Sequence, residues 1–426
     1  MTICCLPNCA YLSETSRMIA VYKQLIAKDE KAIIATHGGT YDFIFKEEGL
    51  NVHYVKPNLS QEQSQEMVAA NRGERGLRGF YTINELRVHV KSEINFFKEN
   101  NISVVLTGFT LSSALSTRVL GIPLAVTHLG SWVPPIFERK MQPFWDDVGY
   151  PITRLIPDAW KNNFVNWLFP RIKFFTKAFT VVAKELGVEP FKNYIDLLMG
   201  DLTMVTDVPE ILSIPLDELE NWIPTNPQLY SRKPRLKYVG AIYAQLFGDV
   251  SEAVKEFLKT EKPKIYVALT SSRPDYVSSV YSILKDMEAQ VLFCSTIHTN
   301  DFEESSNILV RNHFPSHKIM PLVDLVIIHG GQGSIQSAVT AGVPILGFPL
   351  HIEQNFNLKM IERHGAGICS SLKRLKKGTL RPMIEQILSG SSFKSNMQRL
   401  KSYQDRYNGP ENVVKSLQEL ARTENN

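Results

Sequence analysis

The residues best suited to bind an anion lie in one short glycine-rich loop. The apolar run Leu325–Ile328 is followed by His329 and by Gly330-Gly331-Gln332-Gly333-Ser334, after which a helix is expected to run to about Ala341. A strand, a glycine loop and a helix in this order present free backbone N–H groups and the positive end of the helix dipole to a phosphate. The glycines let a diphosphate approach the main chain, and His329 and Ser334 each add a hydrogen-bond donor.

Two common nucleotide-binding motifs do not fit this loop. A dinucleotide-binding fold needs the pattern G-x-G-x-x-G, but Gln336 stands where the third glycine would follow Gly331 and Gly333. A Walker A loop needs a lysine before a serine or threonine, whereas the residue before Ser334 is Gly333. By itself, the loop fits a phosphate site and a glycine turn without a ligand equally well.

The continuation of the chain resembles the donor-binding signature of one glycosyltransferase family. The loop leads to Phe348-Pro349-Leu350-His351-Ile352-Glu353-Gln354-Asn355-Phe356-Asn357 and then to Gly365-Ala366-Gly367. The ordered run from His329 to Gly367 resembles the plant and animal UDP-glycosyltransferases and the bacterial macrolide and antibiotic glycosyltransferases. The resemblance is strong over the C-terminal half and looser over the N-terminal half. It implies a GT-B fold, in which two Rossmann-like α/β domains with parallel sheets face a central cleft.

The resemblance also implies which residues bind the nucleotide-sugar donor. His329 and the segment 331–334 match the residues that hold the diphosphate, while Glu353 and Gln354 match the pair that holds the sugar hydroxyls. A carboxylate and an amide suit that second role because together they accept and donate hydrogen bonds. Segments 271–273 and 312–315 match a phosphate-contacting loop and a base-stacking segment. The implied donor residues are Ser271, Ser272, Arg273, Phe314, His329, Gly331, Gln332, Gly333, Ser334, Glu353 and Gln354.

One donor position departs from the family pattern. Many relatives carry a glutamate three residues after the serine to hold the ribose, but this chain has Ser337 there, preceded by Gln336. Ribose contact could fall to Gln336, and the choice between UDP and dTDP stays open. The sequence contains no DxD motif, so we expect no metal and no further cofactor, with the helix N-terminus offsetting the charge of the leaving diphosphate.

The family's catalytic base has no histidine counterpart here. Inverting relatives use a histidine in a Gly-His-x-x-Arg-like turn after the first strand, oriented by an aspartate. The matching stretch is Ser13-Glu14-Thr15-Ser16-Arg17, and Gly108 occupies the aspartate position. A lone carboxylate can act as a general base, and an aspartate beside it would raise its pKa by repulsion. We therefore predict Glu14 as the base; the alternatives are an alignment through Tyr11, or a Glu14 that only favours the helix N-terminus.

Other residues could belong to an acceptor pocket. His37 and His128 each follow a predicted strand and, with Tyr11, are candidates for contacting the acceptor or for a purely structural role. The stretch 160–186 mixes aromatic and basic residues, which can lie on a membrane surface. Pro170 interrupts that stretch, so a core or acceptor-pocket role is preferred and any membrane contact is expected to be peripheral.

These residues need a scaffold of alternating strands and helices. Short apolar runs are expected to form strands at 3–6, 31–35, 103–106 and 123–126, and again at 265–269, 291–294, 308–310, 325–328 and 345–348. Helical spacing follows them at about 15–27, 40–48 and 84–98. Such alternation predicts parallel sheets covered by helices on both faces. We expect an acceptor domain at 1–240, a donor domain at 263–405, and a C-terminal helix at 406–426 that could return to the N-terminal domain.

The composition is that of an ordinary globular protein. A chain of 426 residues exceeds one comfortable core, which agrees with two domains. Its net charge of +4 is too small to indicate a nucleic-acid partner. The five cysteines form no CxxC pair, so neither a disulfide framework nor a zinc site is indicated. No signal-like leader or spanning-length apolar run is present, and we expect a cytoplasmic protein of undetermined oligomeric state.

The sequence thus predicts a glycosyltransferase. It would move a sugar from a UDP- or dTDP-sugar to a hydroxyl of a small-molecule or lipid-like acceptor, with inversion. A GT-B binding protein without activity is the main alternative, because the usual histidine and aspartate are absent. A sugar-nucleotide epimerase is a weaker alternative, since the signature resembles transferases better.

Overall fold

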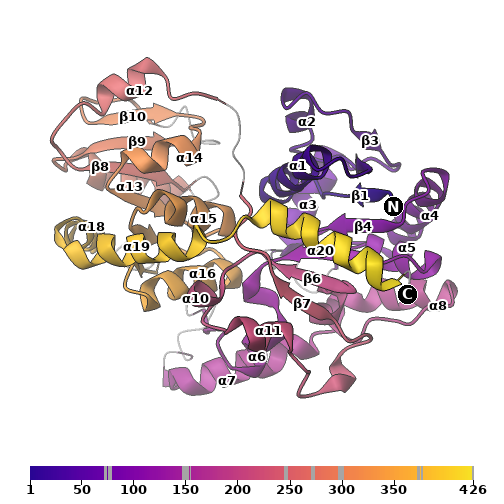
Figure 1. Ribbon diagram of the computed structural model, residues 1–426. Coiled ribbons are helices and arrows are strands. Elements are labelled where there is room, and N and C mark those ends of the chain that lie inside the picture. Colours follow the sequence, from indigo (N-terminus) through magenta and orange to yellow (C-terminus); the bar gives the residue numbers. More distant parts are fainter. Residues whose placement is uncertain are drawn as a thin grey trace.

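The computed structural model describes residues 1–71, 79–145, 155–243, 248–269, 274–295, 302–371 and 378–424, together with residues 74, 153 and 375. The described chain forms two α/β units that lie side by side, one from each half of the sequence (Figure 1). Each unit contains one parallel sheet. The two parallel sheets predicted from the alternating pattern are therefore confirmed.

The N-terminal sheet has seven strands in the order β3-β2-β1-β4-β5-β6-β7. Both of its faces are covered: Cys4 packs into one apolar cluster, and Ile3 and Cys5 pack into another. Because β1 and β4 are parallel neighbours, the loops after them meet at one edge of the sheet. The strands are β1 (Ile3–Cys5), β2 (Ala32–Thr36), β3 (His53–Tyr54), β4 (Val104–Thr107), β5 (Leu124–His128), β6 (Leu202–Val205) and β7 (Arg235–Tyr238).

Helices around this sheet carry several site residues. The helix that follows β1 begins at Leu12, earlier than the predicted Thr15, so Glu14 lies in its first turn. The helices up to β5 are α1 (Leu12–Ala27), α2 (Phe43–Glu47), α3 (Gln61–Asn71), α4 (Ile83–Glu99) and α5 (Ser113–Leu120). After β5 come α6 (Pro134–Glu138), α7 (Asp158–Leu168), α8 (Lys177–Glu185), α9 (Tyr194–Leu198), α10 (Pro209–Leu212) and α11 (Leu216–Glu220).

The C-terminal sheet has six strands in the order β10-β9-β8-β11-β12-β13. Its strands are β8 (Lys264–Ala268), β9 (Gln290–Cys294), β10 (Ile308–Arg311), β11 (Leu325–Ile328), β12 (Ile345–Gly347) and β13 (Gly367–Cys369). Its helices are α12 (Glu252–Phe257), α13 (Pro274–Lys285), α14 (Ser316–Ile319), α15 (Gln332–Ala341), α16 (Ile352–Arg363), α18 (Leu380–Ser389) and α19 (Ser391–Gln404). The glycine loop joins the central strand β11 to α15, as the sequence predicted.

The chain crosses between the two units twice, and the two crossings touch. The last helix, α20 (Gly409–Glu424), runs back across the N-terminal unit and packs on α1 (Figure 1). Gly240 has a φ of +90°, and a Cβ there would lie 2.4 Å from the Cβ of Tyr407. A Cβ on Gly409 would lie 2.2 Å from the carbonyl oxygen of Ala241. Both contacts require glycine, because any side chain would force the two crossings apart.

The aromatic and basic stretch 160–186 is not one continuous helix. It divides into α7, two short 3-10 turns at Phe169–Arg171 and Phe174–Thr176, and α8. Phe179 is fully buried in the N-terminal core, as expected for a core segment. Trp160 and Trp167, in contrast, are exposed on α7. The predicted core role therefore holds only for part of the stretch.

Candidate active site

The carboxylate of Glu14 is held by backbone groups from the loop that follows β4. Its Oε1 accepts hydrogen bonds from the N–H groups of Gly108 and Phe109 at 2.6 and 3.0 Å. Its Oε2 lies 3.8 Å from Nη1 of Arg17, one helical turn later. Glu14 is only 4% exposed. Burial raises its pKa, and the Arg17 charge and the two backbone hydrogen bonds oppose that rise.

The glycine at position 108 is required by this carboxylate. A Cβ built on Gly108 would lie 1.9 Å from Oε2 of Glu14. No side chain can share that space. A glutamate in this position at residue 14 therefore requires a glycine at position 108, where relatives have an aspartate.

Arg17 links Glu14 to the other unit. Its Nη1 donates to the carbonyl oxygen of Thr127 at 3.3 Å, and its Nη2 donates to Oε1 of Gln332 at 3.2 Å. The Arg17 side chain is buried between them. From the sequence alone, Arg17 served only to align the Gly-His-x-x-Arg-like turn and had no assigned role. Its position one helical turn after Glu14 could have indicated an ion pair between them.

The side chain of Gln332 is committed to this contact between the units. Its Oε1 also accepts from Oγ1 of Thr206 at 3.1 Å, and its Nε2 donates to the Thr206 carbonyl oxygen at 3.3 Å and to Oδ2 of Asp207 at 2.9 Å. With Arg17, these partners use the full bonding capacity of the amide. The Gln332 side chain is therefore occupied by contacts between the units, and the prediction that Gln332 contacts the donor now concerns its main chain.

Gln336 has the same orientation. Its Nε2 donates to the carbonyl oxygen of Thr206, and the residue is 2% exposed. It faces the N-terminal unit and not a ribose, which corrects the alternative considered for it. Ser337 instead donates to the carbonyl oxygen of Gly333, within its own helix, at 2.8 Å.

The glycine loop leaves open space at the start of α15. Gly331 is the N-cap of this helix, and a Cβ added to Gly331 or Gly333 would meet no atom within 4 Å. Nδ1 of His329 lies 3.0 Å from the Phe348 carbonyl oxygen. Because a carbonyl only accepts, Nδ1 carries the hydrogen, and Nε2 can donate to a phosphate only from the protonated ring. Ser334, partly exposed, lies in the first turn of α15.

Glu353 and Gln354 lie in the first turn of α16. Oε1 of Glu353 accepts from Nδ2 of Asn357 at 3.0 Å, and its carboxylate also accepts from the Gln332 N–H at the start of α15. Burial raises the pKa of Glu353 to about 7. Oε1 of Gln354 accepts from the Leu350 N–H at 2.8 Å, which orients its amide.

The remaining predicted donor residues are Phe314 and the segment 271–273. Phe314 is 2% exposed and packs edge-on against Tyr266, with ring centroids 5.9 Å apart. Its ring belongs to the C-terminal core, so the prediction that it stacks on a base is corrected. Ser271, Ser272 and Arg273 lie outside the described residues.

The three candidate acceptor residues, Tyr11, His37 and His128, do not form one cluster. His128 ends β5 near Arg17, and burial and that charge lower its pKa to about 3. Tyr11 donates to the Met67 carbonyl oxygen at 3.0 Å and packs edge-on against Phe109. The ring nitrogens of His37 contact the Pro57 carbonyl oxygen and Glu93 at 3.2 and 3.0 Å. It is therefore a buried structural residue.

A hollow of about 430 Å³ lies beside these residues. His89 contributes to its wall and packs on His37, with ring centroids 4.3 Å apart. His89 is 3% exposed, its Nδ1 has no partner among the described residues, and burial lowers its pKa to about 3. Phe80, also in the wall, packs edge-on against Phe109. The lining residues are Leu59, Gln63, Glu66, Met67, Gly79, Phe80, Tyr81, Thr82, Glu85 and His89.

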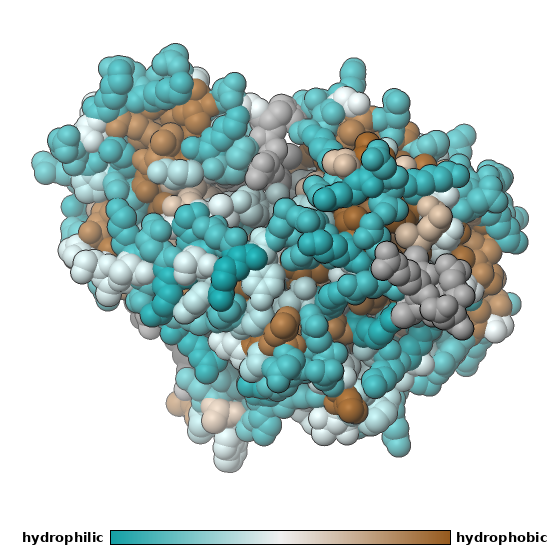
Figure 2. Space-filling view, in the orientation of Figure 1, coloured by the Kyte–Doolittle hydropathy of each residue, from teal (hydrophilic) through white to brown (hydrophobic). Residues whose placement is uncertain are grey.

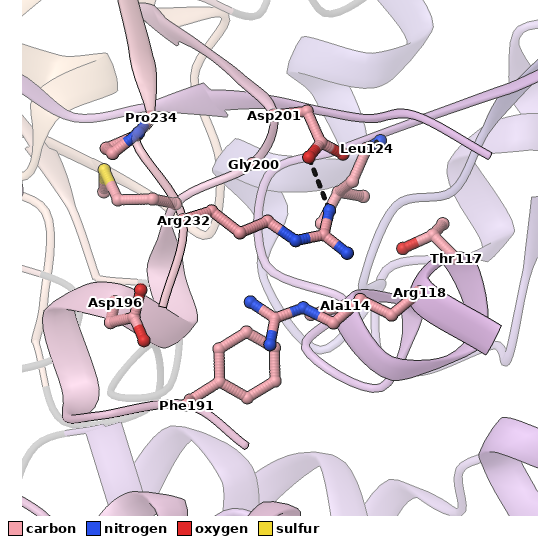
Figure 3. A pocket seen from close by; sticks show the side chains of 11 residues that line it. Ala114, Thr117, Arg118, Leu124, Phe191, Asp196, Gly200, Asp201, Arg232 and Pro234 are labelled. Atoms are coloured by element: carbon pink, nitrogen blue, oxygen red, sulfur yellow. Dashed lines mark hydrogen bonds and ion pairs between the residues drawn. The ribbon is translucent and has the colours of Figure 1, made fainter. Parts of the chain in front are cut away.

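A different hollow, shown in Figure 3, is not suited to a substrate. It has room for about 10 Å³ and lies near the amino ends of β5, β6 and β7, the opposite edge from Glu14. Its two arginines already have partners: Arg232 contacts Asp201 at 2.5 Å, and Arg118 donates to Ser231 at 2.8 Å.

The chain is similar to several known proteins. Residues 284–420 match the family model described as "Erythromycin biosynthesis protein CIII-like, C-terminal domain". A PGL/p-HBAD biosynthesis glycosyltransferase of Mycobacterium tuberculosis is 26% identical over 335 residues, which are 76% of this chain and 72% of that protein. A PGL/p-HBAD biosynthesis rhamnosyltransferase of Mycobacterium bovis is 24% identical over 351 residues, or 79% of this chain and 72% of that protein.

Solved structures share the whole fold. The spinosyn forosaminyltransferase SpnP aligns with a TM-score of 0.66 at 16% identity, over 99% of both chains. The glycosyltransferase VinC, solved in complex with dTDP, aligns with a TM-score of 0.66 at 14% identity, over 99% of this chain and all of that one. Within the described residues, no group of three or more His, Cys, Asp or Glu is placed to hold a metal ion.

Proposed function

We propose that this chain, which is similar to the macrolide and UDP-glycosyltransferases, is a glycosyltransferase of that type and transfers a sugar with inversion from a UDP- or dTDP-sugar to an acceptor hydroxyl. The observation that carries this proposal is the buried contact from Glu14 through Arg17 to Gln332. It joins the proposed base to the first residue of α15, where the donor diphosphate would bind.

The donor half of the proposal rests on the start of α15. Open space above Gly331 and Gly333 gives a diphosphate access to the helix N-terminus, and the protonated ring of His329 would add a donor. VinC and the rhamnosyltransferase SpnG, which share the fold, were each solved with a thymidine diphosphate. Gln354 would direct its amide hydrogens to a sugar hydroxyl, because its Oε1 is already bonded to Leu350.

The chemical step would use the second oxygen of Glu14. Two backbone donors fix Oε1, so Oε2 would take the proton from the acceptor hydroxyl. The acceptor oxygen would form its bond to the anomeric carbon as the bond from that carbon to the diphosphate oxygen breaks. The diphosphate would leave with the bonding electron pair, stabilised by the α15 N-terminus. The raised pKa of Glu14 makes it a stronger base than an ordinary glutamate.

The acceptor would bind in the 430 Å³ hollow of the N-terminal unit. Phe80 connects that hollow to Phe109, whose N–H holds Glu14. The wall combines apolar residues such as Met67 and Phe80 with polar ones such as Gln63, which suits an acceptor that has both apolar and hydroxylated parts. The neutral His89 could form one directional hydrogen bond to a polar group on it.

Release of nucleotide diphosphate tests the proposal. Native protein incubated with UDP- or dTDP-sugars and a panel of apolar alcohols and phenols should release diphosphate and form a glycoside of inverted anomeric configuration. Retained configuration would reject inversion. Donor binding without any release, to water or to an acceptor, would favour a binding protein instead.

A further inference from the structure

The surface of α7 exposes an unusual stripe of large aromatic side chains. Trp160, Phe164 and Trp167 are 71%, 55% and 53% exposed. Their spacing of four and three residues places them on one face of the helix. Leu155, just before the helix, is 84% exposed and extends the stripe. Soluble proteins rarely expose several large apolar side chains together without a partner.

The opposite face of α7 is used inside the protein. Asn166 is buried and makes two hydrogen bonds with the main chain of Gln142, at 3.1 and 2.8 Å. Gln142 in turn donates from Nε2 to the Ile352 carbonyl oxygen at 3.2 Å, directly before Glu353. The helix is thus fixed in orientation, and its aromatic stripe must face outward. In Figure 1, α7 lies at the lower edge of the molecule, and in Figure 2 a few pale and brown residues lie among teal ones at that edge.

Basic residues flank the stripe. The guanidinium of Arg171 lies 5.1 Å from the ring centroid of Trp167 and donates to its carbonyl oxygen. Lys173 and Lys177 follow and are exposed. Residues 155–184 contain five basic side chains but a single acidic one, Asp158, which is paired with Lys161. Aromatic side chains beside exposed cations suit the headgroup region of an anionic bilayer.

The same segment reaches the proposed acceptor hollow. Phe175, between the two lysines, stacks on Phe80 with ring centroids 5.2 Å apart, and Phe80 lines the hollow. Lys173 and Lys177 are therefore each two residues from a side chain that packs on the wall of that hollow. No helix of the described residues is long and apolar enough to cross a bilayer.

We propose that the exposed face of α7, with Arg171, Lys173 and Lys177, docks this protein on the surface of an anionic lipid bilayer. The aromatic rings insert among the headgroups, and the cations contact lipid phosphates and carboxylates. Its consequence for catalysis, that the acceptor is reached from the membrane, rests on the proposed function. Docking itself does not.

Vesicle flotation of the full chain tests the proposal without donor or acceptor. We expect binding to vesicles of phosphatidylcholine mixed with phosphatidylglycerol, weaker binding at high salt, and a blue shift of tryptophan emission on binding. The triple variant Trp160→Ser/Phe164→Ser/Trp167→Ser should lose binding by about tenfold or more, since interfacial affinity scales with buried apolar area. The single variants Phe164→Ser and Phe43→Ser are matched, because Phe43 is 52% exposed on α2, and only the first should weaken binding.

Three results would overturn the proposal. In the first, native protein floats neither with phosphatidylcholine vesicles nor with the mixed vesicles. In the second, the triple variant floats as well as native protein. Alternatively, light scattering without lipid could reveal a native dimer that the triple variant abolishes, which would assign the stripe to a second copy of the chain. Failure of docking leaves diphosphate release unaffected, whereas failure of transfer leaves flotation unaffected.

Discussion

The Oε2 atom of Glu14 occupies the space that a side chain at Gly108 would need, with 1.9 Å between that oxygen and an ideal Cβ. The backbone N–H of Gly108 also donates to the same carboxylate. The two positions therefore constrain each other, because the glycine both makes room for the carboxylate and holds it.

We expect Gly108→Ala to move the Glu14 carboxylate and to destabilise the fold by about 1 to 3 kcal/mol through overpacking. Urea unfolding of Gly108→Ala, Glu14→Ala and the double variant would measure this. In the Glu14→Ala background the added methyl group has space, so the cost should largely disappear. Equal costs in both backgrounds would contradict the steric account.

Glu14→Gln should keep the affinity for nucleotide sugar and lower turnover by about 100-fold or more, as removal of a general base does. Tyr11→Phe is the control, since it removes the alternative candidate hydroxyl and should leave most activity. Because burial raises the pKa of Glu14, native activity should decline on acidification at a higher pH than for an ordinary glutamate. Native turnover in Glu14→Gln would place the base elsewhere.

Nucleotide diphosphate should raise the melting temperature of the protein, because it would bind the folded state at the start of α15. His329→Ala should reduce that rise by removing the proposed cationic donor. His37→Ala should lower the melting temperature itself, since His37 bonds to the buried Glu93, yet leave the ligand-dependent rise unchanged. A normal rise in His329→Ala would remove His329 from the donor site.

Gln354→Ala should weaken binding of the nucleotide sugar by about 1 to 3 kcal/mol and the bare diphosphate much less. Calorimetric titration with both ligands separates the two effects. Gln354→Glu is the matched variant, because it preserves the acceptor for the Leu350 N–H but replaces the amide donor. If both ligands weaken equally, this residue does not contact the sugar.

Glu353 should make the stability of the protein depend on pH near neutrality. Its pKa is about 7 in the fold and lower in the unfolded chain, so the native state binds the proton more tightly. The stabilisation is complete below the unfolded value and is lost as the pH rises through about 7, up to about 3 kcal/mol in total. Urea midpoints of native protein should therefore fall relative to Glu353→Gln between about pH 5 and about pH 8. If the urea midpoints of the two proteins change in parallel with pH, the pKa of Glu353 is not raised.

The sequence was most informative where local pattern determines structure. The strand Leu325–Ile328 has the predicted bounds, and α15 ends at Ala341, as predicted. Strands β3 and β13 were missed because neither His53–Tyr54 nor Gly367–Cys369 is a run of large apolar residues. Strand β6 was missed because Thr203 interrupts its apolar run.

Side-chain direction across the two units could not be predicted in the same way. The sequence places Gln332 and Gln336 at the donor loop, but their amides meet Thr206, 126 and 130 residues away. Phe314 was expected to face a base and instead fills the core beside Tyr266. Such outcomes depend on how one unit packs on another element, which helical or strand periodicity does not encode.

The two chain segments that cross between the units, at Gly240 and at Gly409, pack closely against each other at the junction. The two crossings contact each other closely, so we expect any motion of one unit relative to the other to be a rotation about this line and not a translation along it. Rotation that opens the donor loop must also separate Arg17 from Gln332. The same rotation would then release the nucleotide diphosphate and free the Arg17 guanidinium from its contact with Gln332. Arg17 would return to its position beside Glu14 only when the next donor binds and the two units close again.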